Sequence, residues 1–169
     1  MKSRGRRADG FEEVFDRLFP RAVRLARRML GDLTTAEDIA AEALARAYAQ
    51  WPRVSALPHC DAWVLRVATN LAIDHLRRHP PQLRPLPSAD IGELVTLRMA
   101  LAAALVNLPR RQRQVVTLRY LGELSESEVA MALGISCGSV KTHVHRGLAA
   151  LRARLGPSIE EVVPLGMDR

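Results

Sequence analysis

The stretch from residue 124 to residue 155 constrains the fold most, because it has the pattern of two helices joined by a tight turn. Ser125 and Glu128 match the capping box that opens a helix, and Gly134 is placed to end that helix. Ser136 is a good N-cap for a second, longer helix. These residues together predict a helix-turn-helix.

The second helix has one apolar face and one basic face. The apolar residues recur at the spacing of a buried helix face: Val140, Val144, Leu148, Leu151 and Leu155. No acidic residue lies between Gly134 and Leu155. An α-helix fits the major groove of DNA, and the N-terminal residues of a recognition helix reach the base edges. We therefore predict that this face binds DNA, through Gly138, Ser139, Lys141, Thr142, His145 and Arg146. The alternative is a basic amphipathic helix that packs on its neighbour and shows a solvated charged face.

The net charge of the chain supports a polyanionic partner. The sequence has 25 basic and 18 acidic residues, for a formal charge of +7. Nucleic acid is the commonest partner of such a protein, and a membrane surface is the competing interpretation. No apolar run approaches the roughly 20 residues of a membrane-spanning helix. We expect a cytoplasmic protein without membrane insertion.

The first part of the chain has the pattern of three helices. One begins at Phe11, is broken or kinked at Pro20 and ends at Gly31. The start of the second is predicted from a capping box, either Thr34 with Glu37 or Thr35 with Asp38, and Pro52 ends that helix. The third is predicted to begin at Asp61 as its cap and to end at the prolines that follow residue 79.

A proline-rich segment divides the chain into two helical parts. We predict an all-α fold with these boundaries: a mobile basic tail at 1–10, a helical domain at 11–79, an extended linker at 80–93, a helix-turn-helix domain at 94–155 and a C-terminal tail at 156–169. In the second domain, Leu94, Leu97, Leu101 and Leu105 share one helical face, and Pro109 begins the next helix. The C-terminal tail is either a short docking helix or disordered.

Three motifs in sequence order carry a family resemblance. They are DLTTAEDIAAEALARAYAQW at 32–51, AWVLRVATNLAIDHLRR at 62–78, and LPRRQRQVVTLRYLGELSESEVAMALGISCGSVKTHVHRGLAALR at 108–152. In this order and spacing they resemble bacterial RNA polymerase sigma factors of the extracytoplasmic-function (ECF) type. The resemblance implies that the first domain is sigma region 2, which binds core RNA polymerase and the downstream promoter element. It implies that the second is sigma region 4, which binds the upstream element as duplex.

The resemblance also assigns contacts to the first domain. It places the core polymerase contact on Asp38 and Glu42, which lie one helical turn apart and share a face. Asp38 also has a simpler explanation, as an acid that interacts favourably with a helix N-terminus. Many family members have Gln where this chain has Ala41, so the resemblance puts one side-chain contact to the polymerase clamp in doubt.

The downstream promoter element is assigned to the third helix and the loop before it. The resemblance implies that they bind the nontemplate strand and hold a flipped base, with Arg66, Asn70, Arg77 and Arg78 as the contacting residues. For Asn70 an internal polar pair with Asp74 is an equally good explanation. Trp51 and Trp63 are predicted to be core residues, since only 4% of the chain is aromatic.

The sequence gives little support for catalysis or for cofactors. His75 and His79 are one helical turn apart, but no cysteine or acid cluster completes a metal site around them or around His143 and His145. The two cysteines, Cys60 and Cys137, have neither ligand nor disulfide-framework spacing. We expect no catalytic residue, no metal and no cofactor.

The sequence therefore predicts a sigma factor whose partners are core RNA polymerase and promoter DNA, duplex upstream and single-stranded downstream. An anti-sigma protein is a further candidate partner. Two alternatives remain. The chain could be a helix-turn-helix activator or repressor of duplex DNA that is no polymerase subunit, or its first domain could be an enzyme or interaction module tethered to DNA.

Overall fold

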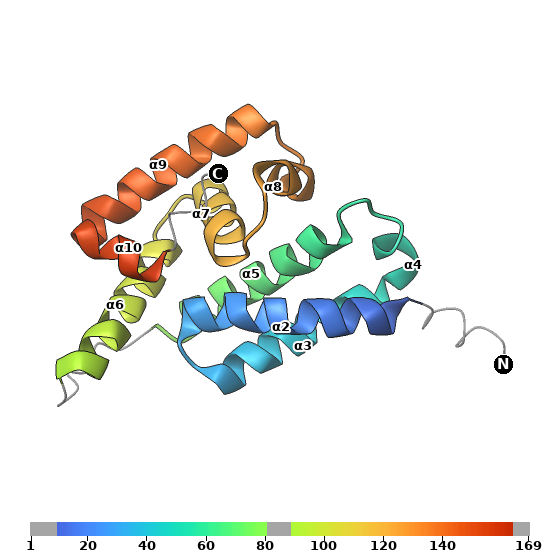
Figure 1. The fold of residues 1–169 in the computed structure, drawn as a ribbon, viewed down its shortest axis with the longest axis horizontal. Helices are drawn as coiled ribbons and strands as arrows, with labels where there is room; N and C mark the ends of the chain where they lie inside the picture. The colour runs from blue at the N-terminus through green and yellow to red at the C-terminus, as the bar shows by residue number, and fades with distance from the viewer. Residues whose placement is uncertain (1–9, 81–88, 164–169) are drawn as a thin grey trace.

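The structure is a computed structural model that describes residues 10–80 and 89–163, and all regular elements in this part of the chain are helical (Figure 1). Their order is α2 (Phe11–Leu30), α3 (Leu33–Ala49), α4 (Trp51–Val54), α5 (Cys60–Arg78), α6 (Ala89–Val106), α7 (Arg110–Val116), the π-helical turn η1 (Thr117–Leu121), α8 (Glu126–Leu133), α9 (Cys137–Leu155), the 3-10 turn η2 (Gly156–Ser158) and α10 (Ile159–Val162). None of these helices is both long and apolar enough to cross a membrane.

Helices α2, α3 and α5 pack around one another and, with α4, form the N-terminal unit. Their facing side chains are fully buried, among them Leu18, Leu44 and Leu65. The sequence predicted a break or a kink at Pro20, and the break is wrong, because α2 continues through this residue. Leu18 and Ala22 on either side of it are 0% exposed, so packing holds the helix across the missing backbone hydrogen bond.

Two predicted helix caps are also wrong. The N-cap of α3 is Asp32, whose Oδ2 accepts a 2.7 Å hydrogen bond from the backbone N–H of Thr35, so neither predicted capping box begins this helix. Asp61 does not cap α5 but lies in its first turn. Its carboxylate binds Arg17 and Arg21 of α2 instead. Trp51, predicted as core, is 5% exposed, and Trp63 packs half-buried against the core.

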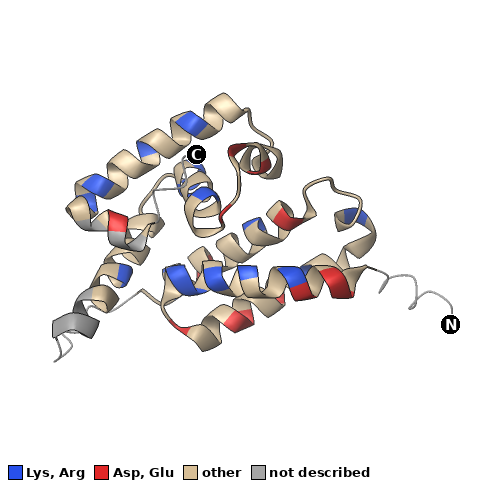
Figure 2. Cartoon of the chain, in the orientation of Figure 1, with Lys and Arg blue, Asp and Glu red and all other residues tan. Residues whose placement is uncertain are grey.

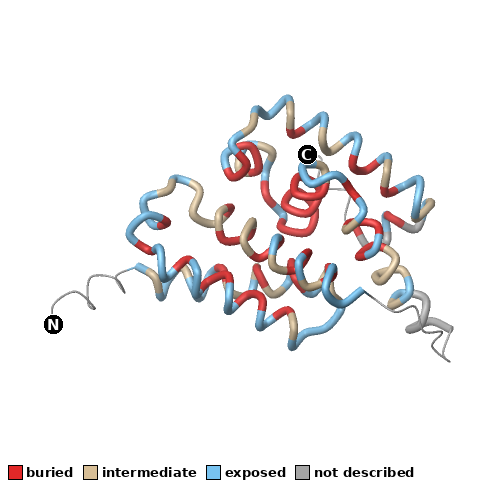
Figure 3. The backbone as a smooth tube through the Cα atoms, turned by 180° about the vertical axis from the view of Figure 1, so that it is seen from behind, coloured by how far each residue is buried: buried red, intermediate tan, exposed pale blue. Residues whose placement is uncertain are grey.

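Helices α6 to α10 form the C-terminal unit, with α7 and η1 at its centre. Every residue from 113 to 122 is buried, which Figure 3 shows as a nearly continuous buried segment of the backbone. The chain leaves the α-helix here through a hydrogen bond from Gly122 N to Thr117 O. Leu101 and Leu105 lie in the core as predicted, whereas Leu94 is 41% exposed.

The helices of the C-terminal unit extend beyond both predicted bounds of the second domain, 94 and 155. Helix α6 begins at Ala89, inside the segment predicted as a linker, and residues 81–88 lie outside the described part of the chain. Of the predicted N-terminal tail of the chain, the structure describes only Gly10. At the C-terminal end of the second domain, η2 and α10 continue the fold, and Ile159 and Val163 are each 1% exposed.

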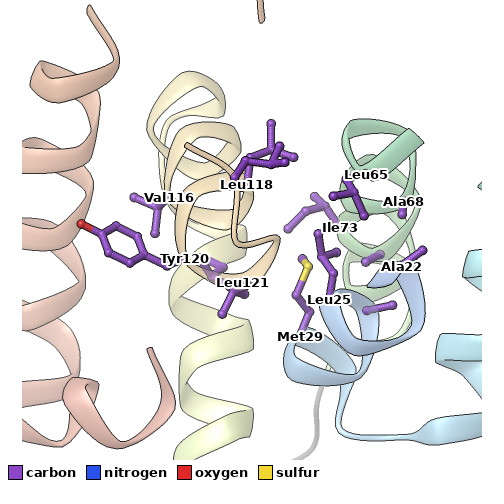
Figure 4. Packing of buried hydrophobic residues seen from close by; sticks show 14 of the residues in the cluster. Ala22, Leu25, Met29, Leu65, Ala68, Ile73, Val116, Leu118, Tyr120 and Leu121 are labelled. Atoms are coloured by element: carbon purple, nitrogen blue, oxygen red, sulfur yellow. The ribbon is translucent and has the colours of Figure 1, made fainter. Parts of the chain in front are cut away.

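The two units share one hydrophobic core. Helices α2 and α5 contact α6 and η1, and α5 also contacts α8. In Figure 4, Leu25, Met29 and Ile73 of the N-terminal unit face Leu118 and Leu121 of η1 across the boundary. All five are 4% exposed or less, so their burial depends on both units.

Gly147 allows α9 to approach α7 closely. A Cβ atom at this position would lie 2.6 Å from Cγ2 of Val116, whose side chain is 1% exposed and has no room to move. We expect Gly147→Ala to lower the free energy of unfolding by about 1–3 kcal/mol, as overpacking of a core does. Thermal and urea unfolding measure the loss.

Gly138→Ala is the matched control on the same helix. The nearest atom to its Cβ would be Ser136 Oγ at 3.8 Å, an ordinary contact. Removing a helical glycine without a clash should stabilise the protein by up to about 1 kcal/mol. Equal effects of the two substitutions would contradict the close approach of α9 and α7.

Candidate nucleic-acid interface

The helix-turn-helix forms as the sequence predicts. Ser125 and Glu128 make both hydrogen bonds of the capping box at the start of α8, and Gly134 ends that helix in the left-handed conformation, with φ +63°. Ser136 caps α9 by accepting a 3.1 Å hydrogen bond from the backbone N–H of Ser139. The turn therefore fixes the N-terminal end of α9 relative to α8.

The residues predicted to bind duplex DNA lie together on the outer face of α9. Gly138, Lys141, Thr142, His145 and Arg146 are exposed, and Ser139 is half-buried. In Figure 2, Lys and Arg residues are spaced along this helix. The Thr142 hydroxyl donates to Gly138 O at 3.0 Å, and a base contact would replace this weak local bond.

Lys141 has one acidic neighbour. Its Nζ lies 3.7 Å from Glu126 Oε2, and its side chain is 69% exposed. An ion pair this long and exposed contributes little, so DNA can displace Glu126 at small cost. Behind Lys141 is a hollow of about 260 Å³, lined by Arg119, Tyr120, Glu126, Lys141, Val144, His145, Leu148 and Arg152.

The residues predicted to bind the single strand lie on α5 and do not form one free surface. Arg66, Asn70 and Arg77 share a face, within about 40° of one another around the helix axis. Arg78 lies about 120° from Arg66 around this axis, and its Nε donates to Asp74 O at 3.2 Å.

Arg66 and Asn70 already have partners in the C-terminal unit. Arg66 Nη1 donates to Ala132 O, at the end of α8, at 2.9 Å. Asn70 Oδ1 accepts from Gln114 Nε2 at 3.4 Å. Burial lowers the pKa of Arg66, and nearby Arg111, Arg110 and Arg53 lower it further. Asn70 therefore bonds across the boundary between the units, which was not among the predicted roles of this residue.

Two ion pairs of Asp61, which no sequence motif indicated, hold the loop before α5. Asp61 binds Arg17 at 2.7 Å and Arg21 at 3.0 Å, which ties the start of α5 to α2. The hydrogen bond to Asp61 raises the pKa of Arg17. Burial raises the pKa of the adjacent Cys60 thiol, which therefore stays protonated at neutral pH. These two ion pairs fix the C-terminal end of the loop at residues 55–59.

Asp38 and Glu42, predicted to bind polymerase, are exposed on α3. Glu42 Oε1 pairs with Arg46 Nε at 2.7 Å one turn along the helix. In Figure 1, α3 lies on the side of the N-terminal unit away from α8 and α9. The pKa of Asp32, which caps this helix, is lowered by its hydrogen bonds to Thr35.

The histidines form no metal site in the described residues. The rings of His75 and His79 lie 4.6 Å apart, centroid to centroid. Burial and the neighbouring His79 lower the pKa of His75. Among the side chains that the structure describes, no three of His, Cys, Asp or Glu are grouped as metal ligands would be.

Comparison with known proteins finds one family model for each of the two units. The family models for Sigma-70 region 2 and Sigma-70 region 4 match residues 14–80 and 98–151. The ECF RNA polymerase sigma factor SigW of Bacillus subtilis (strain 168) is 33% identical over 168 residues, which cover 87% of this chain and 89% of SigW.

Two solved structures share the fold. CnrH, in complex with the cytosolic domain of CnrY, is 23% identical with a TM-score of 0.63, over 88% of this chain and 92% of CnrH. The sigma factor RpoE of Bartonella quintana, in complex with the anti-sigma factor NepR, is 20% identical with a TM-score of 0.56, over 96% of this chain and 99% of RpoE. The identity and coverage of SigW show that this chain belongs to the ECF RNA polymerase sigma factors.

Proposed function

We propose that the chain is the subunit that gives core RNA polymerase its promoter specificity, without chemistry of its own. The observation that carries the proposal is the presence, in order, of region 2 and region 4 in one chain whose second unit exposes a basic recognition helix. Core polymerase and chromosomal DNA are in the cytoplasm, and we infer that the protein acts there. The proposed domains are 11–79 and 94–155, and the second also includes the start of α6 at Ala89 and the helix α10.

Helix α3 is the proposed contact with core polymerase. Asp38 and Glu42 are exposed acids on a chain of net charge +7, which suits a basic protein partner and not DNA. The side chain of Glu42 is 51% exposed, so its pair with Arg46 leaves it free to exchange partners.

Helix α9 is the proposed contact with the duplex upstream element. Its first turns carry Gly138, Ser139, Lys141 and Thr142 at the end that enters the major groove, and His145 and Arg146 follow one turn later. The capped N-terminus adds backbone N–H groups that favour a phosphate.

Helix α5 is the proposed contact with the nontemplate strand of the downstream element. Arg77 and Arg78 supply cationic groups for the backbone, and Arg66 and Asn70 supply hydrogen bonds. The loop at residues 54–60, held by Asp61, is the proposed pocket for the flipped base. An anti-sigma protein is a proposed regulator, as NepR is in the complex with RpoE.

Run-off transcription with purified core polymerase and genomic promoter fragments tests the proposal as a whole. Discrete transcripts that require this chain support it. A chain that binds duplex DNA but neither core polymerase nor any start site would instead support a helix-turn-helix activator or repressor.

Reversing the charge of Glu42 tests the polymerase contact. We expect Glu42→Lys to weaken binding to core polymerase by about ten- to hundredfold, because like charges brought together across an interface cost several kcal/mol. Fluorescence anisotropy of the labelled chain measures the affinity, and circular dichroism checks the helices. Glu160→Lys, an equal charge change on the exposed surface of α10, is the control. Equal affinity of Glu42→Lys and the parent would remove α3 from the interface.

Substitutions along α9 separate base contacts from phosphate contacts. Lys141→Ala and Thr142→Ala should change the preference among upstream sequences, since a good base contact is worth about 1–3 kcal/mol of discrimination. Arg152→Ala, farther along the helix, should weaken all sequences equally and lower the salt slope by about one. Binding to a library of duplexes at two salt concentrations distinguishes them. Uniform weakening by Lys141→Ala would make Lys141 a phosphate contact.

A further inference from the structure

A polar cavity of about 360 Å³ lies between α5 and α7. It is lined by Thr69, Asn70, Ile73, Asp74, Arg77, Arg110, Arg113 and Gln114. The floor of the cavity consists of the four lining residues that are buried: Thr69, Ile73, Arg113 and Gln114. The other four are exposed and form its rim. Sites for small molecules in proteins commonly have volumes of about 300–1,000 Å³, so the cavity is large enough for one small ligand.

Gln114 presents an unpaired polar atom on the floor of the cavity. The residue is 4% exposed, and its Nε2 donates to Asn70 Oδ1 at 3.4 Å. Its Oε1 is buried and accepts no hydrogen bond from any residue that the structure describes. Buried polar atoms in folded proteins are nearly always paired with protein, water or a ligand. This oxygen is therefore placed to accept an N–H from a molecule in the cavity.

The cavity is positively charged. Its lining has three arginines and one carboxylate: Arg77, Arg110, Arg113 and Asp74. Burial lowers the pKa of Arg113, and the nearby Arg77 and Arg110 lower it further. Nη1 of Arg113 donates to Val106 O and Leu108 O, both at 3.0 Å, which fixes this guanidinium at the floor. An anion beside the three arginines would offset their mutual repulsion.

We propose that the cavity is a binding site for a mononucleotide, held by its phosphate and by its base. The arginines supply charge-assisted hydrogen bonds to the phosphate, which the planar guanidinium group matches in geometry. Gln114 Oε1 and the carboxylate of Asp74 accept N–H groups of the base. The exposed guanidinium groups of the rim can also stack on the base. A simple anion would use the arginines alone and would leave the acceptor on the floor unpaired.

The two acceptors favour guanine over adenine. The pairing edge of guanine presents two adjacent donors, N1–H and the 2-amino group, whereas adenine presents one donor beside an acceptor nitrogen. Guanine therefore supplies a donor to Asp74 of α5 and another to Gln114 of α7. Adenine leaves one of these acceptors without a hydrogen bond, which lowers its affinity.

A nucleotide in the cavity has a consequence for the proposed contact with the nontemplate strand. Asn70 and Arg77 line the cavity and are also proposed to bind that strand, so the nucleotide and the strand compete for them. This competition rests on the proposed function, whereas nucleotide binding does not. Binding is measured on the free chain without polymerase, so a failure of the site is distinguishable from a failure of the sigma function.

Isothermal titration calorimetry of the full chain with guanosine monophosphate tests the site. We expect one nucleotide per chain with a Kd below about 1 mM, and about three- to tenfold weaker binding of adenosine monophosphate, which lacks one hydrogen bond. Inorganic phosphate should bind at least about tenfold more weakly, because it makes no contact with the acceptors. Absence of one-to-one binding overturns the proposal, as does equal affinity for guanosine monophosphate and for phosphate alone.

The two arginines that begin α7 provide a matched pair of variants. Both are exposed, but Arg110 lines the cavity and Arg111 does not. Arg110→Ala should weaken guanosine monophosphate about three- to tenfold, as loss of one exposed charged contact implies. Arg111→Ala, an equal charge change at the next residue, should leave the affinity nearly unchanged. Equal weakening by both variants would reduce the binding to general attraction between an anion and a basic chain, and it would overturn the site.

Gln114→Leu tests the contact with the base. The substitution removes Oε1 at similar side-chain volume, so it should abolish the preference for guanosine over adenosine monophosphate while phosphate contacts remain. Circular dichroism checks the fold, and guanosine monophosphate should raise the Tm of the parent more than that of the variant. A preference for guanosine monophosphate that survives in the variant overturns the assignment of Gln114. The comparison of Arg110→Ala with Arg111→Ala does not depend on how this variant folds.

Discussion

The apolar packing of residues 113–122 against both units is the interaction on which the rest of the structure depends. On one side Val116 meets α9 at Gly147, and on the other Leu118 and Leu121 meet α2 and α5. Full burial of a Leu-sized side chain contributes about 1.5–3 kcal/mol, whereas an exposed ion pair contributes about 0.2–1 kcal/mol. Apolar burial therefore holds the units together, and the ion pair of Arg28 Nη1 with Glu123 Oε1, at 2.7 Å, adds a smaller contribution.

This packing has a direct consequence for promoter binding. The recognition helix α9 presents its basic face to solvent, while the α5 face proposed for the single strand is turned toward α7 and α8. The two proposed DNA contacts thus differ in availability before polymerase binds.

Sequence patterns predicted the local structure where the determining residues are neighbours in the chain. The capping box of Ser125 and Glu128, the cap at Ser136 and the stop at Gly134 are confirmed. Asp61 was mistaken for a cap because its real partners, Arg17 and Arg21, lie more than a helix away in the chain. Helix periodicity carries no information about such distant pairs.

Prediction of the candidate site from the sequence is limited in the same way, to residues that are neighbours in the chain. The exposed set on α9 could be predicted because one helix carries it, and the face shared by Arg66, Asn70 and Arg77 follows from helical spacing. Coverage of that face by α7 and α8 could not be predicted, because it depends on residues 44 and 66 positions away in the chain. Arg28 and Gln114 had no motif to mark them, and their partners became visible only in the folded chain.

The central claim is that this chain lets core polymerase open a promoter by capturing a displaced strand on α5. A fluorescent adenine analogue, placed in the downstream element of a promoter selected by run-off transcription, brightens when its base leaves the stack. The account predicts that fluorescence rises when the chain and core polymerase are added together. It also predicts no rise with either alone, and a strongly reduced rise when residues 54–60 are replaced by a glycine-serine linker. A full rise with the replaced loop would remove strand capture from this region, and no rise with any selected promoter would contradict the account as a whole.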